Sequence, residues 1–260
     1  MQLDGKVALV TGGSSGIGEA SARLLAQEGA HVGVLGRTPD ETEKVTQSIQ
    51  KSGGKATTLI ADVSDPEALE KAIKQLGDAQ GHIDIVLANA GINGTWAPLE
   101  ELTVEDYRQT MDINFLGTFL TVKYALPYMK QRGGAIVVVS SVNGTRMFSN
   151  TGATLYACSK AAQVAFTKMT AIELARYKIR INVICPGAIE TEIDENTERQ
   201  NLEKIQYPQE TPKGEIPLTG GKPGSARQVA DLVLFLSSDK SSHITGTEVW
   251  IDGAESLFRG

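Results

Sequence analysis

Two hydrophobic patterns alternate along this chain. Short runs of consecutive apolar, often β-branched residues are separated by longer segments whose apolar positions recur every three or four residues. The first pattern predicts strands that are covered on both faces, as in a parallel sheet, and the second predicts amphipathic helices. We expect strands at 6–10, 31–35, 57–61, 83–88, 135–139, 180–184 and 248–251, and helices at 18–27, 40–51, 66–76, 104–131, 156–176 and 226–236.

The regular alternation of strand and helix predicts the architecture. Strands that alternate with helices of this length build right-handed βαβ units. We therefore expect an α/β fold in which residues 1–260 form a single doubly wound Rossmann-type domain. Its seven-stranded parallel sheet should be flanked by helices on both faces.

One stretch, residues 190–223, breaks this rhythm. It is rich in charged residues, Pro and Gly, and it follows the sixth predicted strand. It should therefore emerge at the carboxyl edge of the sheet, where open α/β folds bind ligands. We interpret this stretch, called the lid segment below, as an insertion that covers a substrate. The alternative is a surface excursion without a role in binding.

Composition narrows the class of protein. The formal net charge of −6 disfavours a nucleic-acid or anionic-membrane partner. The two cysteines, Cys158 and Cys185, have neither a metal-ligand nor a redox spacing, so we expect no metal site, no disulfide framework and a reducing compartment. The sequence shows no signal-peptide pattern at Met1 and no apolar run of membrane-spanning length. We expect a cytoplasmic protein.

A glycine-rich run, TGGSSGIG at 11–18, lies between the first predicted strand and the first helix. Glycine permits positive φ angles and lets a ligand approach the backbone, and a helix N-terminus attracts phosphate. The spacing Gly-x-x-x-Gly-x-Gly differs from Gly-x-Gly-x-x-Gly, and no Gly-Lys-Ser/Thr follows, which excludes a P-loop. A tight turn without a ligand is the alternative, but this placement favours a dinucleotide.

Further motifs follow in an order that resembles the short-chain dehydrogenase/reductase family. They are Asp62-Val63, Asn89-Ala90-Gly91, Asn114, Ser140-Ser141, Tyr156-x-x-x-Lys160, and Pro186-Gly187 followed by Thr191. The resemblance spans residues 3–253 and implies an enzyme that transfers hydride between a nicotinamide cofactor and a carbonyl or alcohol. It also implies a homotetramer, built through the two long helices and the last strand. The cofactor-binding residues that it implies are Gly12, Ser14, Ser15, Gly16, Ile17, Gly18, Asp62, Val63, Asn89, Ala90, Gly91, Tyr156, Lys160, Pro186, Gly187, Ile189 and Thr191.

The end of the second strand indicates which dinucleotide is bound. An acidic residue there would hold the ribose 2′-hydroxyl of NAD, whereas Arg accommodates the 2′-phosphate of NADP. Gly36 stands where NAD-preferring relatives often carry Asp, and Arg37 follows it. Arg suits a phosphate because its planar fork donates two parallel hydrogen bonds. We expect NADP in preference to NAD, the alternative for Arg37 being a solvated strand end.

Tyr156 is the only tyrosine in the chain followed by Lys four positions later, a spacing that puts both on one helix face. The resemblance implies that Tyr156 exchanges the proton and that Lys160 holds the nicotinamide ribose and lowers the tyrosine pKa. It also implies that Ser141 bonds the substrate oxygen and that Asn114 orients a water linking Lys160 to solvent. Each residue also has a structural alternative: packing for Tyr156, a solvated face for Lys160, a turn for Ser141 and a helix-backbone bond for Asn114.

The serine and the substrate remain open at this stage. The segment 142–155 is slightly longer than in relatives, so Ser140 or Ser149 could replace Ser141. A 3-oxoacyl thioester, a ketone or a sugar-type alcohol would each fit, and we expect the loop 92–101 and the lid segment to decide. A function of another class is a non-catalytic dinucleotide-binding protein that senses redox state.

Overall fold

A seven-stranded, all-parallel sheet forms the centre of the molecule, as the hydrophobic pattern predicts. In a computed structural model that describes residues 1–191, 193, 196–206 and 216–259, the strand order is β11-β7-β6-β4-β1-β2-β3. The strands are β1 (Val7–Thr11), β2 (His31–Gly36), β3 (Lys55–Ile60), β4 (Ile85–Ala88), β6 (Gly134–Val139), β7 (Ile179–Pro186) and β11 (Glu248–Ile251). Each predicted strand is present, with its ends displaced by only a few residues.

The direction of winding reverses beside β1. The chain runs from β1 through β2 to β3 on one side and then returns to β4 on the other side of β1. Val10 of β1 pairs with Leu87 of β4 and with Val34 of β2. The chain segments that follow β1 and β4 therefore separate and form a crevice at the carboxyl ends of these strands. Open α/β sheets bind ligands at such a crevice.

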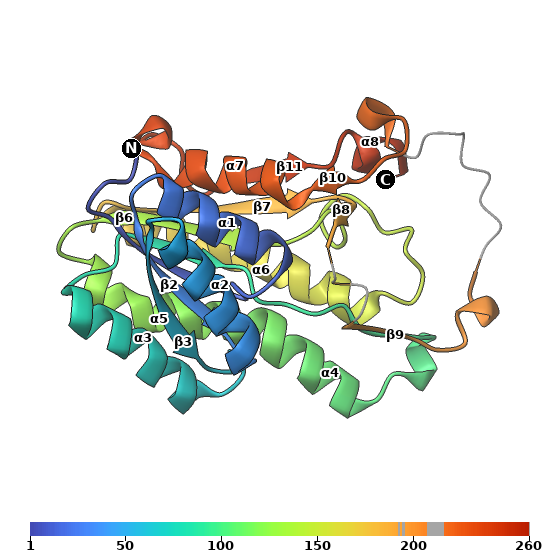
Figure 1. The fold of residues 1–260 in the computed structure, drawn as a ribbon. Helices are drawn as coiled ribbons and strands as arrows, with labels where there is room; N and C mark the ends of the chain where they lie inside the picture. The colour runs from blue at the N-terminus through green and yellow to red at the C-terminus, as the bar shows by residue number, and fades with distance from the viewer. Residues whose placement is uncertain (192, 194–195, 207–215, 260) are drawn as a thin grey trace.

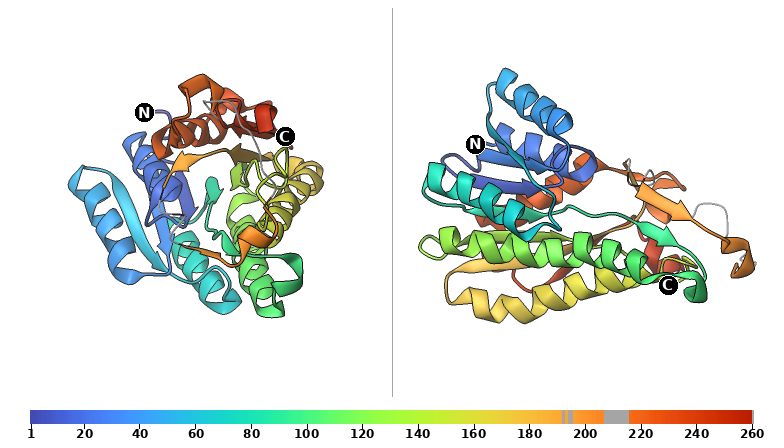
Figure 2. Two further views of the ribbon diagram at one scale, coloured as in Figure 1. Left: turned by 90° about the vertical axis from the view of Figure 1, so that its right-hand side faces the viewer. Right: turned by 90° about the horizontal axis from the view of Figure 1, so that it is seen from below.

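Helices cover both faces of the sheet (Figures 1 and 2). One face carries α1 (Gly16–Gln27), α2 (Pro39–Lys51) and α7 (Ala226–Ser237). The other carries α3 (Pro66–Gln80), α5 (Gly117–Met129) and α6 (Thr154–Ala175). This is the doubly wound Rossmann-type architecture expected from the sequence.

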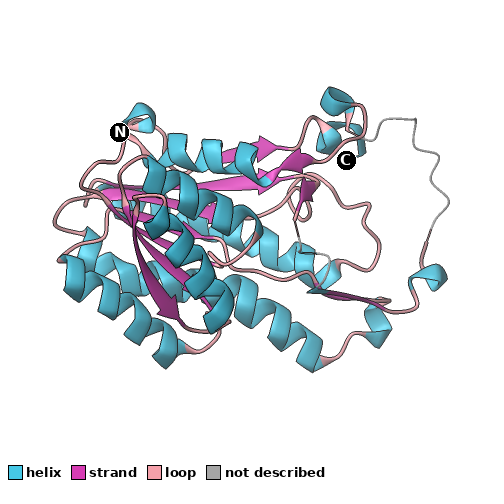
Figure 3. Ribbon diagram, in the orientation of Figure 1, coloured by secondary structure: helices cyan, strands magenta, loops and turns pink. Residues whose placement is uncertain are grey.

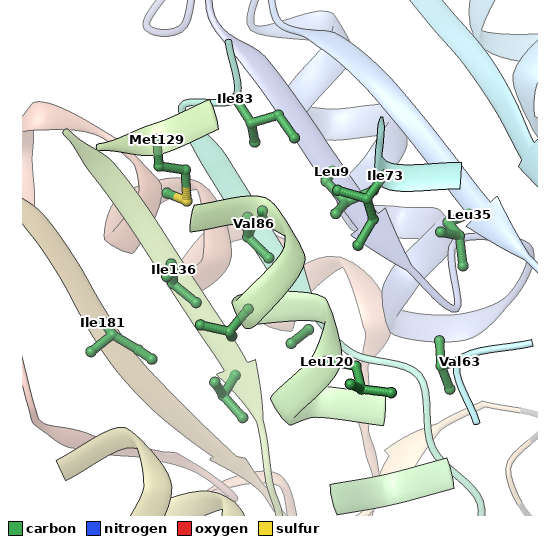
Figure 4. Close-up of a cluster of buried hydrophobic side chains, with 14 of the residues drawn as sticks. Leu9, Leu35, Val63, Ile73, Ile83, Val86, Leu120, Met129, Ile136 and Ile181 are labelled. Atoms are coloured by element: carbon green, nitrogen blue, oxygen red, sulfur yellow. The ribbon is translucent and has the colours of Figure 1, made fainter. Parts of the chain in front are cut away.

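The core alternates between the two faces, residue by residue. Leu9 and Val86 pack toward α3, α5 and α6, in the cluster shown in Figure 4. Val10 and Leu87, their neighbours in sequence, pack toward α1, α2 and α7. Successive side chains of a strand point to opposite faces, so strands buried on both sides must be apolar at every position.

The predicted helix at 104–131 is wrong as one regular element. It consists of α4 (Val104–Met111), a π-helical turn (Asp112–Leu116) and α5, and it ends at Met129. A π turn widens the helix by one residue, an irregularity that frequently marks functional sites. The average apolar period of the segment does not reveal it. Asn114 lies within this turn.

Small elements gather at the carboxyl edge of the sheet (Figure 3), and the sequence analysis predicted none of them. Two short parallel pairs join β5 (Gly94–Trp96) to β9 (Thr197–Arg199) and β8 (Ile189–Glu190) to β10 (Gly224–Ser225). A terminal helix, α8 (Glu255–Arg259), lies at the same end (Figure 1). Single 3₁₀ turns occupy Leu99–Glu101, Leu202–Lys204, Pro217–Thr219 and Asp239–Ser241.

The lid segment is described in part. Residues 192, 194–195 and 207–215 of it lie outside the described residues. Strand β9, within the segment, pairs with β5 of the loop 92–101, so the two stretches expected to decide the substrate are in contact. Nowhere in the described ranges does a helix combine the length and apolarity needed to cross a bilayer.

Candidate active site

A cleft of about 380 Å³ opens at the crevice between β1 and β4. It is lined by residues that the sequence analysis assigned to a cofactor: Gly12, Ser14, Ser15, Gly16, Ile17, Arg37, Asp62, Val63, Asn89, Ala90, Gly91 and Thr191. These residues come from segments up to 180 positions apart, and the sheet topology brings them together. The cleft is therefore the candidate site for the dinucleotide.

The glycine turn at 11–18 is packed so closely that side chains at its glycines would not fit. A Cβ on Gly18 would lie 1.9 Å from the carbonyl oxygen of Gly12, so Gly18 allows β1 and α1 to pack closely and lies beneath the cleft. Gly12 and Gly16 have positive φ angles of 63° and 52°. Ser15 precedes α1 but makes no side-chain cap, which leaves the first N–H groups of the helix for a phosphate. This geometry fits a pyrophosphate.

Thr191 closes the turn from the opposite side. A Cβ on Gly16 would lie 3.2 Å from its Cγ2 atom, so the chain after β8 reaches across to the glycine turn. The cleft is thus bounded by the first crossover and by the start of the lid segment. A bound dinucleotide would contact both.

Asn89 joins the ends of β1 and β4. Its Nδ2 donates to the carbonyl oxygens of Thr11 at 3.0 Å and Gly12 at 3.2 Å, and its backbone N–H donates to Thr11 Oγ1 at 3.0 Å. Asn89 therefore fixes the shape of the glycine turn as well as lining the cleft. The resemblance implied only that this residue binds the cofactor.

The rim at the end of β2 leaves no room for a side chain on Gly36. A Cβ on Gly36 would lie 2.4 Å from Thr42 Oγ1, so an Asp at this position would collide with α2. The Thr42 hydroxyl is held there because it donates to the carbonyl oxygen of Thr38 at 2.7 Å. The exposed side chain of Arg37 lines the cleft, together with Glu41 from the first turn of α2.

Asp62 lies in the cleft and does not cap the next helix. Its Oδ1 accepts hydrogen bonds from the backbone N–H and the hydroxyl of Ser64, at 2.9 and 2.6 Å. Asp65 caps α3 instead, accepting from the N–H groups of Glu67 and Ala68. The Asp62 carboxylate therefore lines the cleft, and a different residue begins α3.

The loop after β7 is held by the C-terminal segment. Gly187 donates its N–H to the carbonyl oxygen of Ile251 at 3.1 Å, and Ala188 donates to the carboxylate of Glu255 at 2.9 Å. Glu255 is only 6% exposed. Pro186 ends β7, and Ile189 begins β8. Pro186, Gly187 and Ile189, which the resemblance assigns to the cofactor, are not among the residues that line the cleft.

Three of the four predicted catalytic residues meet at the ends of β6 and α6. Tyr156 and Ser141 are each 6% exposed, and their hydroxyl groups are hydrogen-bonded to one another. Lys160, 3% exposed, has its ammonium 5.5 Å from the centroid of the Tyr156 ring and donates to the carbonyl oxygen of Val139 at 3.1 Å. The burial of Lys160 contradicts the solvated-face alternative, whereas the burial of Tyr156 is compatible with a packing role as well as a catalytic one.

Gly91 links this cluster to the cleft. A Cβ built on Gly91 would lie 3.4 Å from Lys160 Nζ and 3.2 Å from Asn114 Oδ1. Gly91 itself lines the cleft, so the ammonium lies beside the wall where a dinucleotide would sit.

Burial governs the protonation of both groups on α6. It raises the pKa of the Tyr156 phenol above its usual value, and the hydrogen bond with Ser141 partly opposes this effect. Burial also lowers the pKa of Lys160 to about 8, with a small opposing effect from Cys185. In the chain without a cofactor, the pKa of Tyr156 is therefore raised overall, whereas the resemblance implies that Lys160 lowers it in the working enzyme. Desolvation is the largest cause of this raised pKa.

Asn114 is completely buried and connects three elements. Its Oδ1 accepts from the N–H of Ile92 at 2.8 Å, and its Nδ2 donates to the Ile92 carbonyl oxygen and to Ser159 Oγ, both at 2.9 Å. Ser159 in turn donates to the carbonyl oxygen of Tyr156 at 2.7 Å. The side chain of Asn114 therefore ties the chain after β4 to α6, which differs from the helix-backbone bond considered from sequence.

The neighbouring serines point elsewhere. Ser140 donates to the backbone carbonyl oxygen of Lys160 at 2.8 Å, and the hydroxyl of Ser149 is buried without a hydrogen-bond partner among the described residues. Ser141 is thus the serine in contact with Tyr156. The longer loop at 142–155 turns back toward the lid segment, because a Cβ on Gly152 would lie 2.4 Å from the side chain of Leu202.

Sequence reasoning missed several residues of this region. Glu41 follows Arg37 by four positions at a helix start, a spacing that could have been noticed. Glu255 carries no local signal, since its partner, the N–H of Ala188, is far away in sequence. Elsewhere in the described part of the chain, no group of three His, Cys, Asp or Glu side chains could hold a metal ion.

Comparisons with known proteins agree with this geometry. The short chain dehydrogenase family model matches residues 6–202. The 3-oxoacyl-(acyl-carrier-protein) reductase FabG of Thermotoga maritima is 39% identical over 254 residues, which cover 97% of this chain and 98% of that protein.

Two crystal structures are similar throughout. A 3-ketoacyl-ACP reductase from Sinorhizobium meliloti superposes with a TM-score of 0.94 at 51% identity, covering 97% of this chain and all of that chain (100%). A short chain dehydrogenase from Burkholderia cenocepacia, in complex with NADP, gives a TM-score of 0.85 at 32% identity, with 97% and 98% covered.

These relatives are named as enzymes, so the alternative of a non-catalytic redox sensor is not favoured. The fold, the residues that line the cleft and the similarity to known proteins all indicate the same family. This chain belongs to the short-chain dehydrogenase/reductase family, and it is an oxidoreductase that uses a nicotinamide cofactor to interconvert an alcohol and a carbonyl group.

Proposed function

We propose that this protein is an NADP(H)-dependent carbonyl reductase or secondary-alcohol dehydrogenase in which Tyr156 is the general acid and base. The observation that carries the proposal is the buried Tyr156 phenol, hydrogen-bonded to Ser141 and 5.5 Å, measured at its ring centroid, from the Lys160 ammonium. The substrate is a 3-oxoacyl thioester, a ketone or a sugar-type carbonyl. The names of the reductases above support the first class.

The end of β2 supports NADP over NAD. Arg37 offers a planar pair of donors to a 2′-phosphate, and Gly36 leaves no room for the carboxylate that would hold a ribose 2′-hydroxyl. Glu41 on the same wall opposes this preference, because its charge would repel a phosphate. The preference for NADPH should therefore be clear without being absolute.

The nicotinamide, when bound, supplies or accepts the hydride. Reduction of a carbonyl builds negative charge on its oxygen, and two hydroxyl groups of the chain can meet this charge. Tyr156 donates its proton to the oxygen, while Ser141 donates a hydrogen bond that strengthens as the charge grows. The ammonium of Lys160 holds the cofactor ribose and favours the tyrosinate that remains.

The contact of the loop 92–101 with the lid segment bears on substrate choice. β5 pairs with β9, and Asn93 Nδ2 donates to Thr197 Oγ1 at 2.7 Å. At the edge of this pair, Lys204 donates to Glu101 at 2.6 Å. We propose that residues 1–260 act as one domain in which the lid segment covers the substrate.

The exposed apolar residues of α6 support a homotetramer assembled through its long helices. Met169 and Ile172 of α6 are 79% and 86% exposed, and Phe119 of α5 is 39% exposed. Burying such side chains against a second copy would stabilise an assembly. Light scattering in solution tests this part of the proposal, and a monomer at all concentrations would contradict it.

The test of function is turnover with a substrate panel. Purified protein is mixed with NADPH or NADH and with 3-oxoacyl thioesters, ketones and aldoses, and oxidation is followed by the loss of NADPH absorbance. We expect turnover with at least one class and a higher kcat/KM with NADPH. Tight NADPH binding without turnover of any carbonyl, or of any alcohol with NADP, would overturn the proposal.

A further inference from the structure

Trp250 connects the edge of the sheet to the loop that carries Ser141. It belongs to the edge strand β11, where it pairs with Cys185 of β7, and its indole Nε1 donates to Thr145 Oγ1 at 3.3 Å. Thr145 follows Ser141 by four positions, in the loop after β6. The contact joins residues 105 positions apart, so it exists only in the folded chain.

Thr145 closes the turn that holds the Ser141 hydroxyl. Its Oγ1 donates to the carbonyl oxygen of Ser141 at 2.8 Å and to that of Val142 at 3.0 Å. The backbone N–H groups of residues 146 and 147 also donate to the Val142 carbonyl oxygen, each at 3.0 Å. Within the same turn, the N–H of Asn143 donates to Ser141 Oγ at 3.1 Å. The position of the Ser141 hydroxyl therefore depends on the shape of the turn at 142–147.

Arg146 holds the indole in place. Its guanidinium carbon lies 3.5 Å from the centroid of the Trp250 ring, so the guanidinium stacks on the indole. Arg146 directly follows Thr145, and the indole thus contacts two consecutive residues of the turn, one through its N–H and one through its face. The turn also lies against α6, since a Cβ on Gly144 would lie 2.1 Å from the carbonyl oxygen of Ala157. Contacts from β11 and α6 together fix its shape.

We infer that Trp250 is a positioning residue, which holds the Ser141 hydroxyl against Tyr156 through Thr145 and the turn at 142–147. The indole itself exchanges no proton. Hydrogen bonds weaken steeply as their angle and length depart from the optimum, so a small change of the turn weakens the bond between Ser141 and Tyr156. The inference rests on the proposed function, because the position of Ser141 matters for turnover only if Tyr156 is the acid and base.

The arrangement has a consequence for pH dependence. The hydrogen bond with Ser141 opposes the effect of burial on the Tyr156 pKa, so weakening that bond should raise the pKa further. In alcohol oxidation Tyr156 must accept a proton, and activity rises with pH as the phenol ionises. This rise should therefore occur at higher pH when Trp250 or Thr145 is altered. The charged and titratable groups that face this region come from α6, β7, the turn and the segment that starts at β11: Lys160, Cys185, Arg146, Glu248 and Asp252.

The experiment measures Thr145→Val and Trp250→Phe in two backgrounds, the wild type and Ser141→Ala. Valine has a size similar to threonine but no hydroxyl, and phenylalanine keeps an aromatic face for Arg146 but has no N–H. In the wild-type background we expect each change to lower kcat/KM by roughly threefold to tenfold and to alter the Kd of NADPH by less than about twofold. In the Ser141→Ala background each should lower kcat/KM by less than about twofold, because the hydroxyl on which it acts is absent.

Thr121→Val serves as the matched control. The hydroxyl of this buried threonine donates to the carbonyl oxygen of Gly117 at 2.7 Å, within α5. The control should change kcat/KM by less than about twofold in both backgrounds and leave the pH profile of alcohol oxidation in place. Equal losses from Thr145→Val in both backgrounds would mean that the contact only stabilises the fold, and would overturn the inference. Thr145→Val decides the matter even if Trp250→Phe fails to fold.

Crystal structures of the wild type and of Thr145→Val, each with NADP, give a readout that needs no turnover. We expect the Ser141 hydroxyl within hydrogen-bond distance of the Tyr156 hydroxyl in the wild type and displaced from it in the variant. A hydroxyl that keeps its place in Thr145→Val would overturn the inference. A wild type that turns over no substrate, together with the expected displacement in the variant, would instead overturn the proposed function alone.

Discussion

The ammonium of Lys160 lies 5.5 Å from the centroid of the Tyr156 ring, one helical turn along α6. A cation near an aromatic ring is attracted by its negative face, so the contact orients both side chains. Both are almost completely buried, which makes their protonation depend on desolvation as much as on each other. Burial therefore sets the protonation of both side chains, and a ligand bound in the cleft would change it.

Removing the phenol hydroxyl should abolish most turnover. Tyr156→Phe keeps the ring and its packing, so we expect kcat to fall by roughly 10²–10⁴-fold, as for a lost general acid. The Kd of NADPH, measured by fluorescence titration, should stay nearly unchanged. A variant that retains a tenth or more of the wild-type kcat would show that another group exchanges the proton.

The three candidate serines should separate by activity. Ser141→Ala removes the hydroxyl bonded to Tyr156, and we expect kcat/KM to fall by roughly 10²-fold or more. Ser149→Ala should stay within about twofold of the wild type, because its hydroxyl has no described partner to lose. Steady-state kinetics of both variants at one pH decides between them. A larger loss for Ser149→Ala would reverse the assignment.

Cofactor preference should depend on opposite charges on one wall. Arg37→Ala should weaken NADPH by about tenfold or more and NADH much less, since a hydrogen bond to a charged group contributes about 1.5–3 kcal/mol. Glu41→Gln should strengthen NADPH by a few fold, because a repelling charge is removed. Kd values for both cofactors provide the measurement. Equal losses of NADPH and NADH in Arg37→Ala would contradict the NADP proposal.

The buried Lys160 should make stability rise with pH in the absence of cofactor. Its pKa is about 8 in the folded chain and 10.5 ordinarily, so between these values the unfolded state binds more protons. The burial penalty is fully present below pH 8 and is relieved as pH rises toward 10.5. We expect the free energy of unfolding, relative to Lys160→Met, to rise by roughly 3 kcal/mol across this window.

Urea unfolding of both chains at several pH values gives this difference. Tyr156, whose raised pKa works in the opposite direction at the highest pH, is present in both chains and cancels. A wild type and a Lys160→Met variant with parallel pH curves would mean that Lys160 is not desolvated.

The carboxylate of Glu255 should support cofactor binding through the loop after β7. Glu255→Ala leaves the N–H of Ala188 without its partner, so we expect the Kd of NADPH to rise by about threefold to tenfold and Tm to fall. Glu255→Gln keeps an acceptor and should recover most of both. Leu257→Ala, a change on the same helix at a residue 72% exposed, serves as the control and should alter neither.

The regular elements followed from local pattern because each has a periodic apolar face. Strands β1, β4 and β6 are buried on both sides along almost their whole length, and this property is encoded within a few consecutive residues. The β5–β9 pair was not predictable, since its two strands of three residues lie about 100 positions apart and pair only when the fold brings them together. The π turn around Asn114 was hidden for a related reason, since one extra residue leaves the average apolar period unchanged.

The sequence by itself determined the positions of the strands along the chain, the glycine turn at 11–18 and the spacing of Tyr156 and Lys160, because these depend on residues close together in the chain. Only the tertiary structure decided which serine contacts Tyr156 and that no carboxylate fits at Gly36. It also decided that burial raises the Tyr156 pKa in the chain without a cofactor. Packing and desolvation arise from atoms that are distant in sequence, so no local pattern records them.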